Sequence, residues 1–378
     1  MELKSSVSAI AIFLILTTPA FAINNLKSKL IPDSYIVVLD KGGDSKKDPL
    51  RPTKLKNKAH KVLDQHRISR GQARRFYTDV MGGFAAELTE EEADELRNDL
   101  SVLSVEKDQT YSISQTLSCP VPVSQPAQVM SWGARRIGYG PGTGKVAWVV
   151  DSGIDLCHRD LNVDKARSRS FVDNSAGQDG NGHGTHVAGI IGAKNNSIGT
   201  RGVASNTSLI AVKVLTDTGS SSGSSVLAGL DYVYQNVKSG EVVNLSLGGG
   251  ASTIMDDAVK RIATKGAWVV IAAGNSGAYA GNVSPARANG PRIYTISAYS
   301  SGDYHTSWSN YGNPPVDYSL PGNSILSTYL KGVYASLSGT SMAAPHMAGL
   351  LLLTNGLIRV GGYVKNDPDG VPDRIAIK

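Results

Sequence analysis

The sequence has little cysteine, little phenylalanine and no apolar run long enough to cross a membrane. Its 378 residues include 2 Cys and 5 Phe, too few cysteines for a small disulfide-rich scaffold. The main apolar run, residues 7–16, is shorter than the roughly 20 residues that a spanning helix needs. Cys119 and Cys157 could form a disulfide or remain buried thiols, and both alternatives stay open.

The sequence also has no single block in which its positive charges are concentrated. The formal net charge is +6 and the pI is about 9.1, but Lys and Arg are dispersed, with no tight basic block interleaved with aromatic residues. We therefore expect no nucleic-acid partner. Glycine is abundant, with 41 residues. Many tight turns and close backbone approaches follow from this, as in an α/β enzyme rich in loops.

Residues 1–22 have the pattern of an export signal. Lys4 precedes the apolar run, and Ala-Phe-Ala at 20–22 matches the small-x-small pattern of a cleavage site. The mature protein is therefore expected to be secreted, a retained N-terminal anchor being the alternative. No other segment is a candidate for a membrane span.

Residues 23–116 are predicted to form a small α+β domain. The order of strand-like and helical segments is βαββαβ, that of a ferredoxin-like sandwich. Thr89 and Glu92 have the spacing of a capping box, which predicts a helix start at Glu90. The domain has no catalytic cluster, so we interpret it as a propeptide, with a permanent accessory domain as the alternative. The predicted strands are 34–40, 74–80, 83–88 and 101–106, and the helices are 55–69 and 90–98.

Residues 117–378 are predicted to form a doubly wound α/β domain with a mostly parallel sheet. Short apolar runs alternate with helical segments, and runs without polar alternation suit strands covered on both faces. In such sheets active sites gather at the carboxyl ends of the strands. The predicted strands are 146–150, 209–214, 242–247, 268–273 and 293–298, and the helices are 185–193, 225–237 and 253–265.

Three residues in this domain are catalytic candidates. Asp151 directly follows the strand at 146–150, where a buried carboxylate is well placed to hold an imidazole. Histidine is the side chain whose unperturbed pKa is nearest to neutral pH, as a general base requires, which makes His183 the second candidate. Ser341 is predicted at a helix N-terminus, where the helix dipole favours negative charge. Taken singly, each residue has an ordinary structural explanation, such as capping a turn or a helix.

The neighbours of these candidates add two expectations. His186 lies three positions after His183, but a zinc pair of the His-Glu-x-x-His type is excluded because no Glu stands between them. Pro345 is expected within the first turn of the helix that begins near Ser341, where its missing N–H does little harm.

The three segments together resemble the subtilisin-like serine proteases, with most similarity to the proteinase K branch. The resemblance is carried by the order Asp, His, Ser along the chain and by the segments Asp-Gly-Asn-Gly-His-Gly-Thr-His (179–186) and Gly-Thr-Ser-Met-Ala (339–343). The α/β-hydrolases differ in both respects, because their order is Ser, Asp, His and their serine lies in a Gly-x-Ser-x-Gly elbow. The resemblance implies that Ser341 is the nucleophile, His183 the base and Asp151 the group that orients it. It further implies that Asn275 donates its amide to the oxyanion, and that no cofactor serves catalysis.

The resemblance also implies which segments bind substrate. Segments 246–248 and 272–274 are the two walls of the pocket for the residue before the cut, and 219–221 pairs with extended substrate. Because these segments carry no charge, a broad preference for large apolar or aromatic residues is expected. Gly223 stands near a position where the proteinase K branch often has an aromatic residue, which predicts a more open upstream subsite. The substrate-binding candidates are Gly219, Ser220, Ser221, Ser246, Leu247, Gly248, Ala272, Ala273 and Gly274.

Calcium and the propeptide follow from the same resemblance. Asp317 falls where some relatives bind structural calcium, with the carbonyl groups of Pro291 and Ile293 as further ligands. The first domain is then a propeptide that assists folding and blocks the cleft with residues 105–115. Self-cleavage is expected between residues 112 and 120. The expected partners are protein or peptide substrates and the chain's own propeptide, with no membrane partner and a monomeric enzyme.

Two other functions compete with that of a secreted endopeptidase. A catalytically silent relative that serves as a binding protein would lack a triad residue, and none is missing. An esterase or amidase could use the same triad, since esters yield to it more readily. Digestion of casein with and without a serine-directed inhibitor, beside an ester assay, distinguishes the three.

Overall fold

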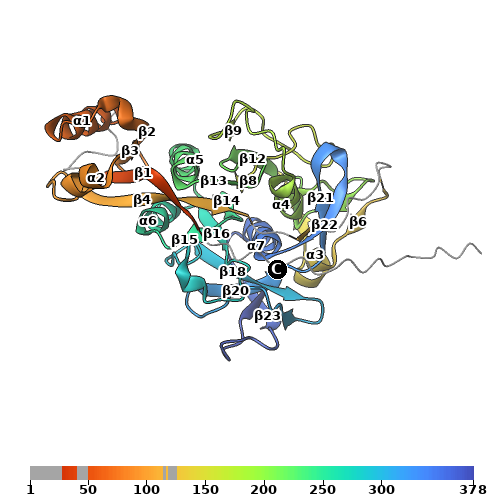
Figure 1. The fold of residues 1–378 in the computed structure, drawn as a ribbon. Coiled ribbons are helices and arrows are strands. Elements are labelled where there is room, and N and C mark those ends of the chain that lie inside the picture. Colours follow the sequence, from red (N-terminus) through yellow and green to blue (C-terminus); the bar gives the residue numbers. More distant parts are fainter. Residues whose placement is uncertain (1–27, 41–49, 114–115, 118–125) are drawn as a thin grey trace, which may run out of the picture.

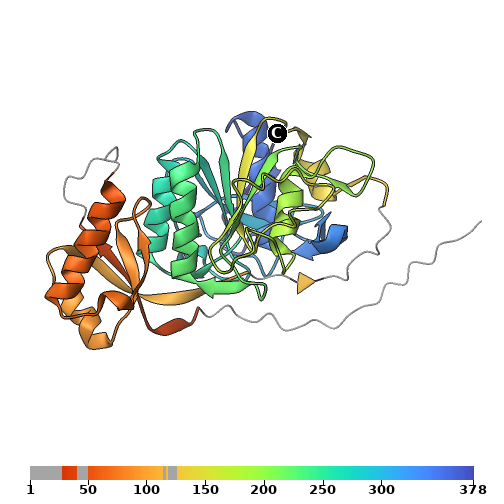
Figure 2. The same cartoon turned by 90° about the horizontal axis from the view of Figure 1, so that it is seen from above.

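The computed structural model describes residues 28–40, 50–113, 116–117 and 126–378. The predicted export signal and Cys119 lie outside these ranges. The described chain forms a small N-terminal domain at one end of a larger α/β domain (Figure 1). Figure 2 shows the small domain against the helices that cover one face of the large sheet.

The N-terminal domain has the predicted βαββαβ order. Its strands form an antiparallel sheet in the order β4-β1-β3-β2. The helices cover one face of the sheet around a core that includes Val37, Leu63, Phe84 and Leu96. The capping box at Thr89 is formed in both directions. The elements are β1 (Leu30–Leu39), α1 (Arg51–Gln65), η1 (Arg70–Gln72), β2 (Ala73–Tyr77), β3 (Gly83–Glu87), α2 (Glu90–Arg97) and β4 (Val102–Ser112).

The large domain contains the predicted, mostly parallel sheet with helices on both faces. The strand order is β23-β24-β20-β18-β16-β14-β8-β12-β9, with β19 paired to β18. The main strands are β8 (Val146–Asp151), β12 (Ser208–Lys213), β14 (Val242–Leu245), β16 (Trp268–Ala272), β18 (Ile293–Ser300) and β20 (Val316–Pro321). The covering helices are α4 (His183–Gly192), α5 (Gly223–Asn236), α6 (Thr253–Ala263) and α7 (Thr340–Thr354).

The strands of this sheet are apolar on both faces because each face has its own core. In β8, Trp148 and Val150 pack in the core that contains residues of α5 and α6. Ala147 and Val149 pack in the core that contains residues of α4 and α7. A strand with this environment has no polar face, which explains the unbroken apolar runs in the sequence.

The structure has several elements that the sequence analysis did not predict. Helix α3 (Trp132–Ile137) is short, and β23 (Arg359–Tyr363) and β24 (Arg374–Ile377) extend the sheet beyond β20. In the described ranges, each helix falls short of the length and apolar character needed to cross a membrane. The remaining elements are β5 (Thr116–Leu117), β6 (Val129–Met130), β7 (Gly140–Pro141), β9 (Arg169–Ser170), β10 (Thr200–Arg201), β11 (Ala204–Ser205), β13 (Ser220–Ser222), β15 (Gly249–Gly250), η2 (Ala280–Asn282), β17 (Val283–Ser284), β19 (Tyr304–His305), β21 (Ile325–Thr328), η3 (Leu330–Gly332) and β22 (Tyr334–Ser338).

The two domains contact each other through polar groups, through a shared sheet and through an apolar cluster in which Tyr77 and Met81 join residues of α5. Strand β4 pairs antiparallel with β13 of the large domain. Asp231 of α5 accepts hydrogen bonds from the backbone N–H groups of Asp79 (2.9 Å) and Val80 (2.5 Å). Asp108 of β4 accepts one from Ser224 N at the start of α5. Burial raises the pKa of both Asp108 and Asp231.

Candidate active site

Asp151 and His183 form a buried hydrogen-bonded pair at the carboxyl edge of the sheet. Asp151 is the last residue of β8 and His183 is the first residue of α4. Nδ1 of His183 lies 2.7 Å from Oδ1 of Asp151, and both side chains are completely buried. The other ring nitrogen, Nε2, has no hydrogen-bond partner among the described residues. It is therefore available to exchange a proton with a reacting group.

The loop before α4 is organised by Asp179. Its carboxylate accepts hydrogen bonds from the backbone N–H groups of Asn181 (2.9 Å), Gly182 (3.0 Å) and Thr185 (3.0 Å). It also accepts one from the Ser152 hydroxyl at 2.9 Å. The first N–H groups of α4 are satisfied by three side chains, His183 N by Asn181, Gly184 N by Ser152 and Thr185 N by Asp179. The helix therefore begins at His183, two residues before the predicted start. Burial is the main cause that raises the pKa of Asp179.

A glycine allows α4 to approach β8 closely. A Cβ atom at Gly184 would lie 2.0 Å from the carbonyl oxygen of Gly153 and 3.1 Å from Cβ of Asp151. Any side chain here would push the helix away from the strand and lengthen the Asp151–His183 contact. The glycines around His183 therefore serve close packing of the helix against the strand as well as the turn before the helix.

Ser341 lies in the first turn of α7, as predicted. Its hydroxyl donates to the carbonyl oxygen of Ser246 at 3.2 Å, and it forms no hydrogen bond with His183. Pro345 is the sixth residue of the helix, so the prediction that it lies in the first turn is wrong. Because Pro345 has no N–H, the Ser341 carbonyl is released from the helix and accepts the Ser246 hydroxyl at 2.9 Å instead.

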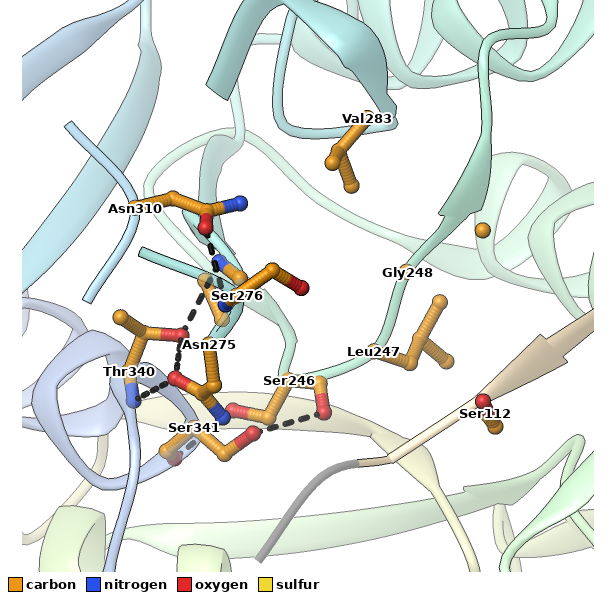
Figure 3. Close-up of a pocket in the computed structure, with 13 residues that line it drawn as sticks. Ser112, Ser246, Leu247, Gly248, Asn275, Ser276, Val283, Asn310, Thr340 and Ser341 are labelled. Atoms are coloured by element: carbon orange, nitrogen blue, oxygen red, sulfur yellow. Dashed lines mark hydrogen bonds between the residues drawn. The ribbon is translucent and has the colours of Figure 1, made fainter. Parts of the chain in front are cut away.

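Asn275 follows β16 and is held by Thr340, the residue before Ser341. Oδ1 of Asn275 accepts from the backbone N–H and the hydroxyl of Thr340, each at 2.8 Å. Thr340 Oγ1 in turn accepts from Gly274 N at 3.0 Å. With Oδ1 fixed in this way, the amide nitrogen of Asn275 lies on the side of Ser341 (Figure 3). The positioning of Asn275 by Thr340 was not predicted from the sequence.

A pocket opens beside Ser341 (Figure 3). The structure brings together five of the six predicted wall residues, but Ala273 is fully buried and its carbonyl accepts the Asn310 amide instead. Ser276, Val283 and Asn310 were missed because the loops of Ser276 and Asn310 and the two-residue strand β17 of Val283 have no distinctive sequence pattern. The lining residues carry no charge: Ser112, Ser246, Leu247, Gly248, Gly249, Ala272, Gly274, Asn275, Ser276, Val283, Asn310, Thr340 and Ser341.

The end of β4 runs through the cleft as a strand between two segments of the large domain. Ser112 exchanges two backbone hydrogen bonds with Gly248, of 3.1 and 3.2 Å. Ile113 N donates to Gly219 O at 3.1 Å. Ser220 and Ser221 pair with Ser112 and Tyr111, so the predicted segment 219–221 contacts this tail and does not line the pocket.

The space beside Gly223 is filled by an aromatic side chain of the tail. Tyr111 is buried, and a Cβ atom at Gly223 would lie 2.9 Å from its ring. A Cβ atom at Gly249 would lie 3.0 Å from the same ring. The absence of both side chains leaves room for the tyrosine.

The other candidate ligands make separate contacts within the fold. His186 Nε2 lies 3.0 Å from Ala335 O, and burial lowers the pKa of His186 to about 3. Asp317 accepts from Thr295 N at 2.9 Å, and burial raises its pKa to about 6. Ile293 is the first residue of the neighbouring strand β18, and Pro291 lies two residues before it. Within the described ranges, no three His, Cys, Asp or Glu residues are arranged around a common point.

The structure describes only one of the two cysteines, Cys157. Cys157 is exposed, and the amine of Lys165 lies 3.5 Å from its sulfur. An exposed sulfur does not fit the alternative of a buried thiol at this position. The pairing of Cys157 with Cys119 stays a prediction, because Cys119 lies outside the described residues.

A buried Asp–His pair and a serine at the rim of a doubly wound sheet define the class of α/β serine hydrolases. The family model described as Subtilase family matches residues 142–357, and Peptidase inhibitor I9 matches residues 34–114. The chain belongs to the subtilase family. It is a subtilisin-like serine endopeptidase with an N-terminal inhibitor domain, as the resemblance in the sequence implied.

Relatives and a solved structure agree with this assignment. An alkaline serine protease of Corniculantispora psalliotae is 38% identical over 300 residues, which cover 75% of this chain and 74% of the relative. An extracellular serine proteinase of Thermus sp. is 36% identical over 373 residues, covering 92% and 83%. The crystal structure of a cold adapted subtilisin-like serine proteinase matches with a TM-score of 0.58 and 39% identity, and covers 65% of this chain and 96% of that one.

Proposed function

We propose that this chain is a secreted endopeptidase, made as a self-processing zymogen, in which Asp151, His183 and Ser341 carry the reaction. The observation that carries the proposal is the 2.7 Å hydrogen bond between the buried Asp151 carboxylate and His183. It leaves Nε2 of the imidazole without a partner among the described residues. An imidazole held in this way can act as a general base that accepts the proton of a nucleophilic hydroxyl.

In the proposed reaction, His183 Nε2 takes the proton of Ser341 as Oγ attacks the peptide carbonyl. The hydroxyl first turns away from Ser246 O, a rotation about one side-chain bond. Asp151 stabilises the imidazolium that forms, and His183 then passes the proton to the leaving amine. Water hydrolyses the acyl-enzyme through the same base. The Asn275 amide and the Ser341 N–H donate to the oxyanion.

The substrate is expected to bind as the tail does. Strand β13 and Gly248 hold the tail by backbone hydrogen bonds, which do not depend on side-chain identity. Selectivity then comes from the uncharged pocket beside Ser341, lined in part by Leu247 and Val283. A large apolar or aromatic residue before the cut suits this lining better than a charged one, because an unpaired charge is costly to bury.

The test is digestion of casein by the secreted product, with and without a serine-directed covalent inhibitor. We expect inhibitor-sensitive proteolysis that Ser341→Ala abolishes and that Ser205→Ala, a change at another buried serine, retains. Ester hydrolysis without proteolysis would favour an esterase, and no hydrolysis at all would favour a binding protein. Equal cleavage of matched peptides with Lys and Phe before the cut would contradict the proposed pocket preference.

Self-processing is tested by the intact mass of the product. The wild-type chain is expected to lose its N-terminal domain by a cut between residues 112 and 120. Ser341→Ala, expressed alone, is expected to keep its full pro-form mass. Maturation of Ser341→Ala to the wild-type mass would show that another protease makes the cut.

A further inference from the structure

A buried positive charge lies beside the Asp151–His183 pair and has no part in the proposed reaction. Lys213 is the last residue of β12 and is paired in register with Asp151 on the neighbouring strand. Its side chain is 0% exposed. Its ammonium donates to Ser152 O at 2.7 Å and to Asp217 at 2.8 Å. An ammonium is costly to bury, and these short bonds offset that cost only while the geometry is kept.

The contacts of Lys213 reach the loop that carries His183. Its partner Asp217 packs against Gly180, where a Cβ atom would lie 2.3 Å from the carboxyl carbon of Asp217. The side-chain amide of Asn181 donates to Asp217 O at 3.0 Å. One ammonium therefore connects the end of β8, just after Asp151, with the loop just before His183.

A second connection between the same two segments passes through Ser152. Its hydroxyl donates to Asp179 at 2.9 Å and accepts from Gly184 N at 3.0 Å. Asp179 also holds the backbone N–H groups that precede and follow His183, as described above. Ser152 is thus fixed on its carbonyl side by Lys213 and on its hydroxyl side by Asp179.

We propose that Lys213 and Asp179 are positioning residues, which fix Ser152 from two sides and thereby set the spacing between Asp151 and His183. The proposal rests on the proposed catalytic roles of that pair. Lys213 and Asp179 act on the reaction only through this spacing. Small displacements of reacting groups are expensive, since a shift of about 1 Å can cost about a hundredfold in rate.

The test uses the full chain with Lys213→Met or Asp179→Asn. Both changes keep the side-chain size and remove the charge. We expect kcat on a peptide substrate to fall about tenfold or more, with KM changed less than about twofold. The self-processing rate of the refolded full chain is expected to fall by a similar factor. Asp217→Asn, at a side chain 63% exposed, is expected to fold readily and to lower kcat by a smaller factor.

The matched control is Asp160→Asn. Asp160 is also fully buried and also accepts hydrogen bonds, from Thr200 N at 3.1 Å and the Asn196 amide at 2.8 Å, but it has no contact with this cluster. We expect this change to lower the melting temperature and to leave kcat unchanged. A fall in melting temperature without a fall in kcat for all three cluster variants would overturn the proposal.

A double-mutant cycle separates positioning from general destabilisation. In an Asp151→Ala background there is no Asp–His spacing left to set, so Lys213→Met and Asp179→Asn are expected to change the residual rate less than about twofold. Equal losses in both backgrounds would overturn the proposal. An inactive wild-type chain, or an active Ser341→Ala chain, would instead refute the proposed function. A fully active wild type with normal cluster variants would refute the positioning role alone.

Discussion

The two domains of this chain are built from sheets of different kinds, antiparallel in the small domain and mostly parallel in the large one. In the N-terminal domain β2 and β3 pair across a short connection, and the helices pack on the strands next to them. In the large domain the main strands pair in parallel, and each parallel pair needs a crossover connection between its strands, as β8 does with β12 and β14. Such long-range pairing folds slowly. The small domain therefore offers a preformed strand, β4, against which β13 can pair.

The groups that hold the two domains together also differ from the groups that are proposed to carry the reaction. The small domain contacts the large one by backbone pairing of β4, by hydrogen bonds to the carboxylates of its own Asp108 and of Asp231 on α5, and by an apolar cluster shared with α5. The proposed chemical groups all lie in the large domain. Changes in one set should therefore leave the other largely unaffected, and the predictions below test this separation.

The largest expected effect is on turnover, from Asn275→Leu. Loss of an oxyanion donor costs about 3 to 4 kcal/mol of barrier, so kcat should fall a few hundredfold with KM little changed. Inhibition by the separated N-terminal domain should persist, because Asn275 is not part of the β4 pairing. Steady-state kinetics with and without added N-terminal domain measure both. Unchanged kcat would remove Asn275 from the site.

The next effect is on refolding, from Phe84→Ala in the small domain. Phe84 is fully buried, and its truncation costs about 3 to 5 kcal/mol. This loss is a large part of the free energy of unfolding of a small domain. The yield of active enzyme after refolding of the full chain from denaturant should fall about tenfold, since slow folding of the large domain loses its helper. Leu100→Ala, at a side chain 99% exposed, is the control and should refold normally. Equal yields from both variants would mean that the large domain folds unaided.

A smaller effect is expected in the pH dependence of propeptide binding. Burial raises the pKa of Asp108 and Asp231 above the usual 3.8. A complex that raises the pKa of an acid binds protons, so its affinity is highest at low pH and falls as the pH rises through the raised values. Inhibition constants measured from about pH 4 upward should show this slope. Asp231→Asn should flatten it and Asp257→Asn, at an exposed residue of α6, should not; a slope of opposite sign would contradict the reasoning.

The smallest expected effect concerns calcium at Asp317. One carboxylate with two carbonyl groups supplies few of the six to eight oxygens that calcium prefers, so we expect a rise in melting temperature of only a few degrees, about 2 to 4 °C. The effect should disappear below about pH 6, where Asp317 is protonated. Scanning calorimetry with calcium or a chelator, on wild type and Asp317→Asn, measures it. The same rise in Asp317→Asn would place calcium elsewhere.

Periodicity and turn chemistry were enough to predict much of the fold. The run at 146–150 became β8, and Thr89 with Glu92 correctly marked the start of α2. The strands β23 and β24 were missed because they are short and paired only at the edge of the sheet. The early start of α4 was missed because it depends on the side chains of Asn181, Ser152 and Asp179, whose hydrogen bonds to the first helical N–H groups a sequence does not display.

The sequence by itself determined which side chains are present to react and, through apolar runs and glycine positions, the order of strands and helices that carries them. Only the tertiary structure decided that Nδ1 of His183 lies 2.7 Å from the Asp151 carboxylate and that the Ser341 hydroxyl donates to the Ser246 carbonyl. It also decided that the ammonium of Lys213 is buried against the Ser152 carbonyl, next to Asp151. The reason is that local patterns depend on near neighbours along the chain. Distances between groups far apart in sequence depend on how whole layers pack.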